Sequence, residues 1–324
     1  MKAYRFIISL SILVFIFCVS CLGKSAAAES KKPMFPLSIE ALRLRVYPGS
    51  EITVEKQIAA TDKYTSFLFS YKSDDLKLYG LMYIPVTDDK NKKFPTVVVD
   101  HGYIPPEKYS TINSYHDISA YYASNGFLVF KPDYRGHASS QGSAIGPFRS
   151  VYYSIDVLNL ISSIKTYPKT DINRLLIYGH SMGGEVTLRV LEISNDIKAA
   201  TLWAPVSAPF PENTLFYVRM GGEKAVEEFE TTLKKEISPG DYDSISPLYF
   251  TEYIKVPILL QHGTADQEVP YDWSLRLNKE FDRTGVKYDF ITYEGENHNL
   301  NVKSYPTVKR RDIEFFNRIL NAQK

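Results

Sequence analysis

The chain has 324 residues and a formal net charge of +1 at pH 7, with 44% hydrophobic and 23% charged residues. A chain of this length can bury about three quarters of its unfolded surface, so it does not need disulfides to fold. Its balanced charge provides no field that would attract nucleic acid or select anionic substrates, which argues against nucleic-acid binding. The sequence has no nucleotide-binding loop and no cluster of metal-ligating residues, so we expect no cofactor and no metal.

The two cysteines, Cys18 and Cys21, both lie near the N-terminus. The rest of the chain can therefore form no internal disulfide, and it tolerates an oxidising compartment without mispairing. It also offers no thiol nucleophile, zinc–thiolate site or iron–sulfur cluster.

Residues 1–28 have the pattern of a signal peptide or lipoprotein leader. Lys2 and Arg5 precede an apolar run over residues 6–19. That run is too short to span a bilayer comfortably but has the length of a signal-peptide core. We therefore expect export to the periplasm or the cell exterior, with an uncleaved N-terminal anchor as the alternative.

Two cleavage sites compete within this leader. The three alanines at 26–28 fit a signal peptidase site, whereas Val-Ser-Cys at 19–21 resembles the end of a bacterial lipobox. Cys18 stands where a lipobox usually has leucine. Attachment to a membrane, through the leader or through a lipidated Cys21, stays open beside full release.

The segment 29–50 is rich in lysine and alanine and contains Pro33 and Pro36, so we expect it to be a tether. A catalytic domain is expected over 51–324. Three runs with strand character, separated by polar turns, predict an antiparallel meander at its start. These runs are residues 52–54, 65–71 and 76–85.

Beyond this meander, strands and helices alternate along the chain. The continuous apolar run at 95–100 is typical of a strand that is buried on both faces of a sheet. Alternation of this kind predicts an α/β fold whose mostly parallel central sheet has helices on both faces. The further strands are expected at 127–130, 175–178, 199–203, 256–261 and 288–293, and helices near 118–125, 155–164, 185–192 and 308–319.

An insertion at 206–252 interrupts the alternation. It is rich in aromatic residues and contains a charged helical stretch at 223–235. An insertion at the carboxyl end of a parallel sheet is a common place for a lid. The alternative is a structural excursion whose aromatic side chains pack into the core, and the sequence leaves both interpretations open.

The apolar strand at 175–178 runs into Gly-His-Ser-Met-Gly-Gly at 179–184, and a helix is expected to follow. This order of strand, Gly-x-Ser-x-Gly and helix is what a nucleophile elbow requires. Glycines flank the serine because the turn leaves no room for side chains. We therefore predict that Ser181 is a nucleophile, against the alternative of an ordinary glycine-rich turn.

A serine nucleophile needs a base, and the base needs an acid that orients it. After an elbow of this kind the acid precedes the histidine in the chain. His298, in a loop between the last strand and the last helix, is the predicted base, and His262 is more consistent with a buried strand-end residue. Asp266 is the predicted acid, since it follows a strand end, and its competitors are Asp241, Asp243 and Asp282.

Two N–H donors are needed for the oxyanion that forms on attack. The backbone N–H of Met182, directly after the nucleophile, is one prediction. The backbone N–H of Tyr103, in the His-Gly-Tyr that follows the strand at 95–100, is the other. His101 and the polar loop at 133–139 are expected to support the site rather than to react.

Six segments together resemble the α/β-hydrolase superfamily. Within it they are similar to the catalytic domain of the prolyl oligopeptidase family and to dienelactone-hydrolase-like esterases. The resemblance covers nearly all of the chain from about residue 50. Its segments are Ser-Asp-Asp-Leu-Lys-Leu-Tyr-Gly at 73–80, His-Gly-Tyr at 101–103, Asp-Tyr-Arg-Gly at 133–136, the motif at 179–184, His-Gly-Thr-Ala-Asp at 262–266, and His298.

This resemblance implies a serine hydrolase that acts on a small-molecule ester or a short peptide, with Ser181, Asp266 and His298 as the triad. Peptidases of the family usually carry a large N-terminal β-propeller, which does not fit before Glu51. They also commonly have a second glycine where this sequence has Tyr103. A carboxylesterase and a peptidase are therefore both expected possibilities, and a non-catalytic binding protein on the same fold is the alternative of another class.

Overall fold

The structure, a computed structural model, describes residues 33–322. The predicted leader at 1–28 lies outside the described residues. From Met34 onward, the described residues form one compact unit. Among the described helices, none combines the length and the apolar character needed to cross a bilayer.

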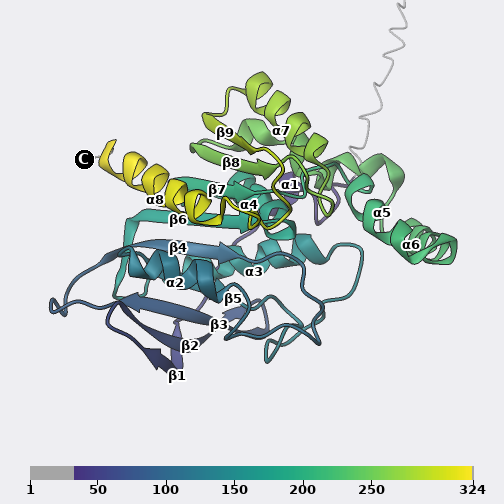
Figure 1. The fold of residues 1–324 in the computed structure, drawn as a ribbon. Coiled ribbons are helices and arrows are strands. Elements are labelled where there is room, and N and C mark those ends of the chain that lie inside the picture. The colour runs from purple at the N-terminus through teal and green to yellow at the C-terminus, as the bar shows by residue number, and fades with distance from the viewer. Residues whose placement is uncertain (1–32, 323–324) are drawn as a thin grey trace, which may run out of the picture. The chain divides into compact units, whose positions relative to one another are not determined.

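Within residues 33–322, nine strands form one sheet in the order β1-β2-β3-β5-β4-β6-β7-β8-β9 (Figure 1). The first three strands and β5 pair antiparallel. All pairs from β5 through β9 are parallel. The predicted sheet, mostly parallel with an antiparallel start, is confirmed. Its strands are β1 Thr53–Ala60, β2 Tyr64–Ser73, β3 Leu76–Pro85, β4 Phe94–Asp100, β5 Leu128–Pro132, β6 Thr170–His180, β7 Ala199–Trp203, β8 Ile258–Gly263 and β9 Tyr288–Tyr293.

The central strands contain continuous apolar runs because both faces of the sheet are covered there. In β4, Val98 points into one hydrophobic core, and Val97 and Val99 point into the other. Strand β6 does the same, with Ile177 on the first side and Leu176 on the second. Successive side chains of a strand point to opposite faces, so a continuous apolar run supplies both cores at once.

Helices cover both faces, as the alternation of strands and helices predicted. α3, α4 and α7 contribute to the core that contains Val98. α2 and α8 contribute to the core that contains Val97. The eight α-helices of the described chain are α1 Ile39–Leu44, α2 His116–Ser124, α3 Arg149–Ile164, α4 Met182–Ile193, α5 Glu212–Val218, α6 Glu223–Glu236, α7 Tyr271–Thr284 and α8 Tyr305–Ala322.

Residues 34–50, which were expected to belong to a tether, are instead part of the compact unit. Ser38 caps α1 by accepting the N–H of Ala41 at 3.1 Å, and Ile39 and Leu42 of this helix are buried. The chain that follows is held to α3, because the N–H of Gly49 donates to Asn159 Oδ1 at 3.1 Å. The prediction failed because α1 is too short to show a helical period.

The insertion at 206–252 is mostly helical. It consists of α5, α6 and the 3-10 helices η1 Arg219–Gly221, η2 Pro239–Asp241, η3 Asp243–Ile245, η4 Pro247–Tyr249 and η5 Thr251–Tyr253. Phe210 and Leu233 are buried in one hydrophobic cluster with Leu42 of α1. Phe216 packs edge-on against Trp273 of α7 with ring centroids 5.3 Å apart. Several of its aromatic side chains are therefore structural, and whether the segment moves as a lid stays a prediction.

A buried carboxyl group joins α8 to the sheet. Asp312 of α8 accepts hydrogen bonds from Gln261 Nε2 at 2.9 Å, Trp203 Nε1 at 3.3 Å and Tyr122 Oη at 2.9 Å. Burial raises the pKa of Asp312 to about 8, against the opposing effect of these donors. Burial thus favours the protonated form of this group, and its donors favour the carboxylate.

Substitution of Asp312 tests this anchor. Asp312→Ala leaves three buried donors without an acceptor, which should lower the free energy of unfolding by about 3 kcal/mol or more. Asp312→Asn keeps an acceptor for Gln261 and Trp203 and offers its amide to Tyr122, so its loss should be less than half as large. Urea unfolding of both variants measures the difference. Equal stability of the two would contradict the assigned role.

Candidate active site

Ser181 lies at the sharp turn between β6 and α4, as the elbow pattern predicted. Its backbone has φ 59° and ψ −123°, a strained conformation for a residue with a side chain. Three backbone hydrogen bonds hold it there: its N–H donates to the carbonyl of Trp203 at 3.0 Å, and its carbonyl accepts from Gly184 at 2.9 Å and Val206 at 3.0 Å. The surrounding backbone thus maintains this turn at the carboxyl end of β6.

The glycines beside the serine have a steric reason. A Cβ at Gly183 would overlap the backbone carbonyl of Asp100 at the end of β4, and one at Gly179 would overlap the side chain of Thr187. No side chain can be accommodated where backbone atoms already fill the space. The close approach brings the end of β4 to the start of α4.

Asp266 and His298 are brought together as predicted. His298 Nδ1 donates to Asp266 Oδ2 at 2.7 Å. Burial alone would raise the pKa of Asp266, but hydrogen bonds from His262 and His298 hold it well below its usual range. Asp266 is therefore an ionised carboxylate that fixes the His298 tautomer, which leaves Nε2 unprotonated and able to accept a proton.

Sequence reasoning missed the part that His262 plays. This residue is fully buried, as expected of a strand-end histidine, but its Nε2 also donates to Asp266 Oδ2 at 3.0 Å. The Ser274 hydroxyl donates to its Nδ1 at 2.7 Å, which fixes the ring. His262 thus orients the carboxylate that orients His298. In the sequence, the short distance between His262 and Asp266 in His-Gly-Thr-Ala-Asp could have indicated this contact.

Glu296 was also missed. Its buried carboxylate accepts the backbone N–H groups of Val302, Lys303 and Ser304, each at 2.8 Å. These bonds close the loop that carries His298 onto the start of α8. Only the loop position of this glutamate, two residues before the histidine, could have suggested it.

Ser181 and His298 lie at the same edge of the sheet. The carbonyl oxygen of His298 accepts from Nε2 of His180, the residue before the nucleophile, at 3.1 Å. No hydrogen bond joins Ser181 Oγ to His298 Nε2 among the described side chains, and that nitrogen lies 3.9 Å from a carboxylate oxygen of Glu268. Hydrogen bonds between nucleophile and base are often long before substrate binds.

The loop that carries Tyr103 passes close to Ser181. A Cβ at Gly102 would stand 3.1 Å from Ser181 Cβ, so the loop after β4 runs directly beside the nucleophile. The N–H of Gly102 itself donates to Tyr115 Oη at 2.8 Å, which leaves the N–H of Tyr103 as the next donor of that loop. Met182 begins α4. The ring of Tyr103 is half exposed and lies 5.0 Å from the Arg149 guanidinium.

His101 supports the loop after β4, as expected. Its buried ring is stacked between Tyr134, with centroids 4.1 Å apart, and Tyr109, at 4.6 Å. Its Nδ1 donates to the carbonyl of Gly102 at 2.8 Å. These contacts fix the backbone that leads to Tyr103.

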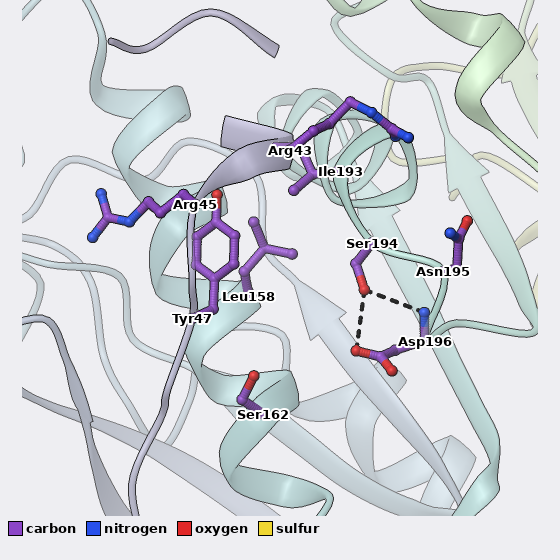
Figure 2. A pocket seen from close by; sticks show the side chains of 9 residues that line it. All are labelled: Arg43, Arg45, Tyr47, Leu158, Ser162, Ile193, Ser194, Asn195 and Asp196. Carbon is purple, nitrogen blue, oxygen red and sulfur yellow. Dashed lines mark hydrogen bonds between the residues drawn. The ribbon is translucent and has the colours of Figure 1, made fainter. Parts of the chain in front are cut away.

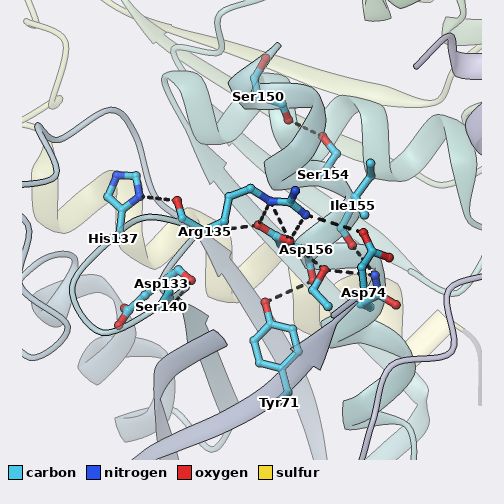
Figure 3. A network of polar contacts seen from close by, with 12 residues as sticks. Tyr71, Asp74, Asp133, Arg135, His137, Ser140, Ser150, Ser154, Ile155 and Asp156 are labelled. Atoms are coloured by element: carbon cyan, nitrogen blue, oxygen red, sulfur yellow. Dashed lines mark hydrogen bonds and ion pairs between the residues drawn. The ribbon is translucent and has the colours of Figure 1, made fainter. Parts of the chain in front are cut away.

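The polar loop at 133–139 is held by an ion pair and by hydrogen bonds (Figure 3). Arg135 forms a bidentate ion pair with the buried Asp156 of α3, with Nη2 to Oδ1 at 2.6 Å and Nε to Oδ2 at 3.0 Å. Asp156 also accepts from Ser73 at 2.7 Å. The sequence prediction of a structural role for this loop agrees with these contacts.

A cavity of about 270 Å³ lies at the other end of α4 from Ser181 (Figure 2). It includes none of the triad residues, so it is separate from the candidate active site. Its lining consists of Arg43, Arg45, Tyr47, Leu158, Ser162, Ile193, Ser194, Asn195 and Asp196. Across residues 33–322, no three His, Cys, Asp or Glu side chains are grouped to hold a metal ion.

Residues 113–323 match the prolyl oligopeptidase family, which is also called the S9 peptidase family. The chain belongs to this family. Among curated relatives, the prolyl endopeptidase FAP of Bos taurus is 27% identical over 237 residues, which cover 71% of this chain and 30% of FAP. Dipeptidyl peptidase 8 of Mus musculus is 26% identical over 247 residues, covering 72% of this chain and 26% of that protein. The chain thus spans less than a third of the length of each of these two relatives.

Solved structures share its fold. Acylaminoacyl peptidase of Pyrococcus horikoshii superposes with a TM-score of 0.64 at 21% identity, over 81% of this chain and 44% of that one. Acetyl xylan esterase 1 of Thermoanaerobacterium sp. JW/SL YS485 superposes with a TM-score of 0.65 at 14% identity, over 86% and 90%. The α/β-hydrolase fold and the family of serine hydrolases expected from the sequence are both confirmed.

The buried imidazole of His180 predicts a pH dependence of stability. Burial, followed by the charge of His298, lowers the pKa of His180 to about 3. An unfolded histidine has a pKa of about 6.5, so between these values the unfolded chain binds a proton that the folded chain does not. The resulting stabilisation is complete above about pH 6.5 and decreases as the pH falls.

His180→Gln should therefore reduce the slope of unfolding free energy against pH, near pH 5, by about 1.4 kcal/mol per pH unit, the equivalent of one proton. Urea unfolding at a series of pH values measures this slope. His116→Gln, at an exposed position, controls for the loss of an imidazole elsewhere. An unchanged slope in His180→Gln would refute the assignment.

Proposed function

We propose that this protein is an exported serine hydrolase that cleaves an ester or amide bond through an acyl-enzyme on Ser181. The observation that supports this most is the strained Ser181 backbone at a strand end beside two loops, one carrying His298 and the other Tyr103. A strained nucleophile beside an oriented imidazole is the arrangement that acyl transfer needs.

In the proposed reaction, Ser181 Oγ attacks the acyl carbon and its proton passes to Nε2 of His298. Asp266, ionised and bonded to Nδ1, stabilises the imidazolium that forms. The imidazolium then protonates the leaving alcohol or amine, and water repeats the cycle to release the acid. The N–H groups of Met182 and Tyr103 are the proposed donors to the oxyanion, an interaction worth several kcal/mol in such sites.

The substrate class is a small ester or a short peptide. Membership of the prolyl oligopeptidase family, and relatives named as endopeptidases and dipeptidyl peptidases, favour the peptide. Tyr103, where those peptidases commonly have a glycine, favours an esterase. A binding protein on a hydrolase fold is the alternative of another class.

Export to the periplasm or the cell exterior is part of the proposal and rests on the pattern of residues 1–28. The mass of the N-terminal peptide of the mature protein distinguishes cleavage after Ala28 from lipid attachment at Cys21. An unprocessed N-terminus on a cytoplasmic protein would refute export.

A fluorophosphonate probe tests the nucleophile. The folded wild-type protein should be labelled at Ser181. Ser181→Ala should not be labelled, and its turnover should be lower by a factor of roughly 10⁴ to 10⁶. Matched ester and anilide substrates with one acyl group then separate esterase from peptidase by kcat/KM.

Near-normal hydrolysis by Ser181→Ala would contradict the mechanism. Absence of labelling and hydrolysis in a folded wild-type protein would favour the binding protein.

A further inference from the structure

His180, the variable residue of the Gly-x-Ser-x-Gly motif, contacts two loops that lie far apart in the sequence. It ends β6, directly before Ser181, and is only 5% exposed. Its Nε2 lies 3.1 Å from the carbonyl oxygen of His298. Its Nδ1 lies 2.5 Å from Tyr115 Oη.

The partners fix the direction of every hydrogen bond in this chain of contacts. A carbonyl oxygen only accepts, so Nε2 of His180 carries the proton and donates to His298. Nδ1 of the neutral ring is then an acceptor, and the Tyr115 hydroxyl must donate to it. The same hydroxyl oxygen accepts the N–H of Gly102 at 2.8 Å. A single set of protons satisfies all three contacts.

The backbone of Tyr115 gives a second, independent indication. Its φ of 57° and ψ of 22° place a bulky residue in the left-handed region, directly before α2. Such strain persists only where surrounding contacts determine the conformation, and it gathers at functional sites. Here the strained residue carries the hydroxyl that reaches both Gly102 and His180.

We propose that His180 and Tyr115 are positioning residues that tie together the oxyanion loop at Gly102, the Ser181 elbow and the loop of His298. Neither residue touches the reacting atoms. Tyr115 accepts the Gly102 N–H, so the Tyr103 N–H is the one left to bind the oxyanion. His180 holds the backbone of His298 and thereby fixes the position of that ring relative to Ser181. This inference rests on the proposed function.

We call the hydrogen bonds that link Gly102, Tyr115, His180 and His298 the bridge. Breaking it should reduce turnover rather than substrate binding. A displacement of about 1 Å in a catalytic group can cost on the order of 10²-fold in rate. His180→Leu removes both hydrogen bonds at similar volume and should lower kcat about 30- to 100-fold, with KM changed less than about threefold, since oxyanion and base act in the transition state. Tyr115→Phe removes one oxygen atom and should lower kcat about 10-fold.

The conservative variant His180→Gln keeps a donor for His298 and an acceptor for Tyr115, so it should recover kcat to within about fivefold of the wild type. The double variant Tyr115→Phe with His180→Leu should lose clearly less kcat than the product of the two single losses, because both changes remove the same hydrogen bond between Tyr115 and His180. Tyr288→Phe, which removes a hydroxyl bonded to Asp282 at the surface, is the matched control.

The experiment measures kcat and KM on one activated ester for each variant, with urea unfolding to show that each is folded. If His180→Leu fails to fold, Tyr115→Phe and His180→Gln carry the comparison. Wild-type kcat in Tyr115→Phe, or losses that multiply in the double variant, would overturn the bridge while the wild type stays active. A wild type that neither hydrolyses the ester nor labels at Ser181 would overturn the proposed function and the bridge with it.

Discussion

The close approach of two backbone segments, the end of β4 and the start of α4, determines the rest of the site. Gly183 has no side chain because the carbonyl of Asp100 occupies the space. The turn at Ser181 has a positive φ, and the loop after β4 passes beside the nucleophile. The strain is maintained by hydrogen bonds to Trp203 and Val206, which belong to the next strand and its loop.

Around this turn, two buried carboxyl groups, Asp266 and Asp312, hold the other parts of the site in place through hydrogen bonds. Hydrogen bonds from two histidines lower the pKa of Asp266, whereas burial raises the pKa of Asp312 because its donors do not offset it. The first carboxylate can stabilise a positive charge on His298, and the second anchors α8 behind the same loop. Position in the hydrogen-bond network, rather than burial alone, sets the opposite directions in which the pKa values of these two carboxyl groups are shifted.

Much of this arrangement could be predicted from local sequence. The apolar runs of β4 and β6 show the buried parallel sheet, and the order of Ser181, Asp266 and His298 predicts three groups that the fold does bring to one edge. The N-terminal helix could not be predicted, since six residues give too little periodicity. The contact between Tyr115 and His180 spans 65 positions, and the parallel pairing of β4 with β6 brings the segments that carry them together.

The position of α1 sets a limit on how the chain can be shortened. Leu42 is buried in one cluster with apolar side chains of α3 and of the insertion, and Phe35 packs against Phe148 with ring centroids 5.8 Å apart. Both predicted cleavage sites precede this helix, so removal of the leader at either one would leave the hydrophobic cluster intact. A protein trimmed to begin at residue 51 would instead expose that cluster to water, and would invite self-association through it.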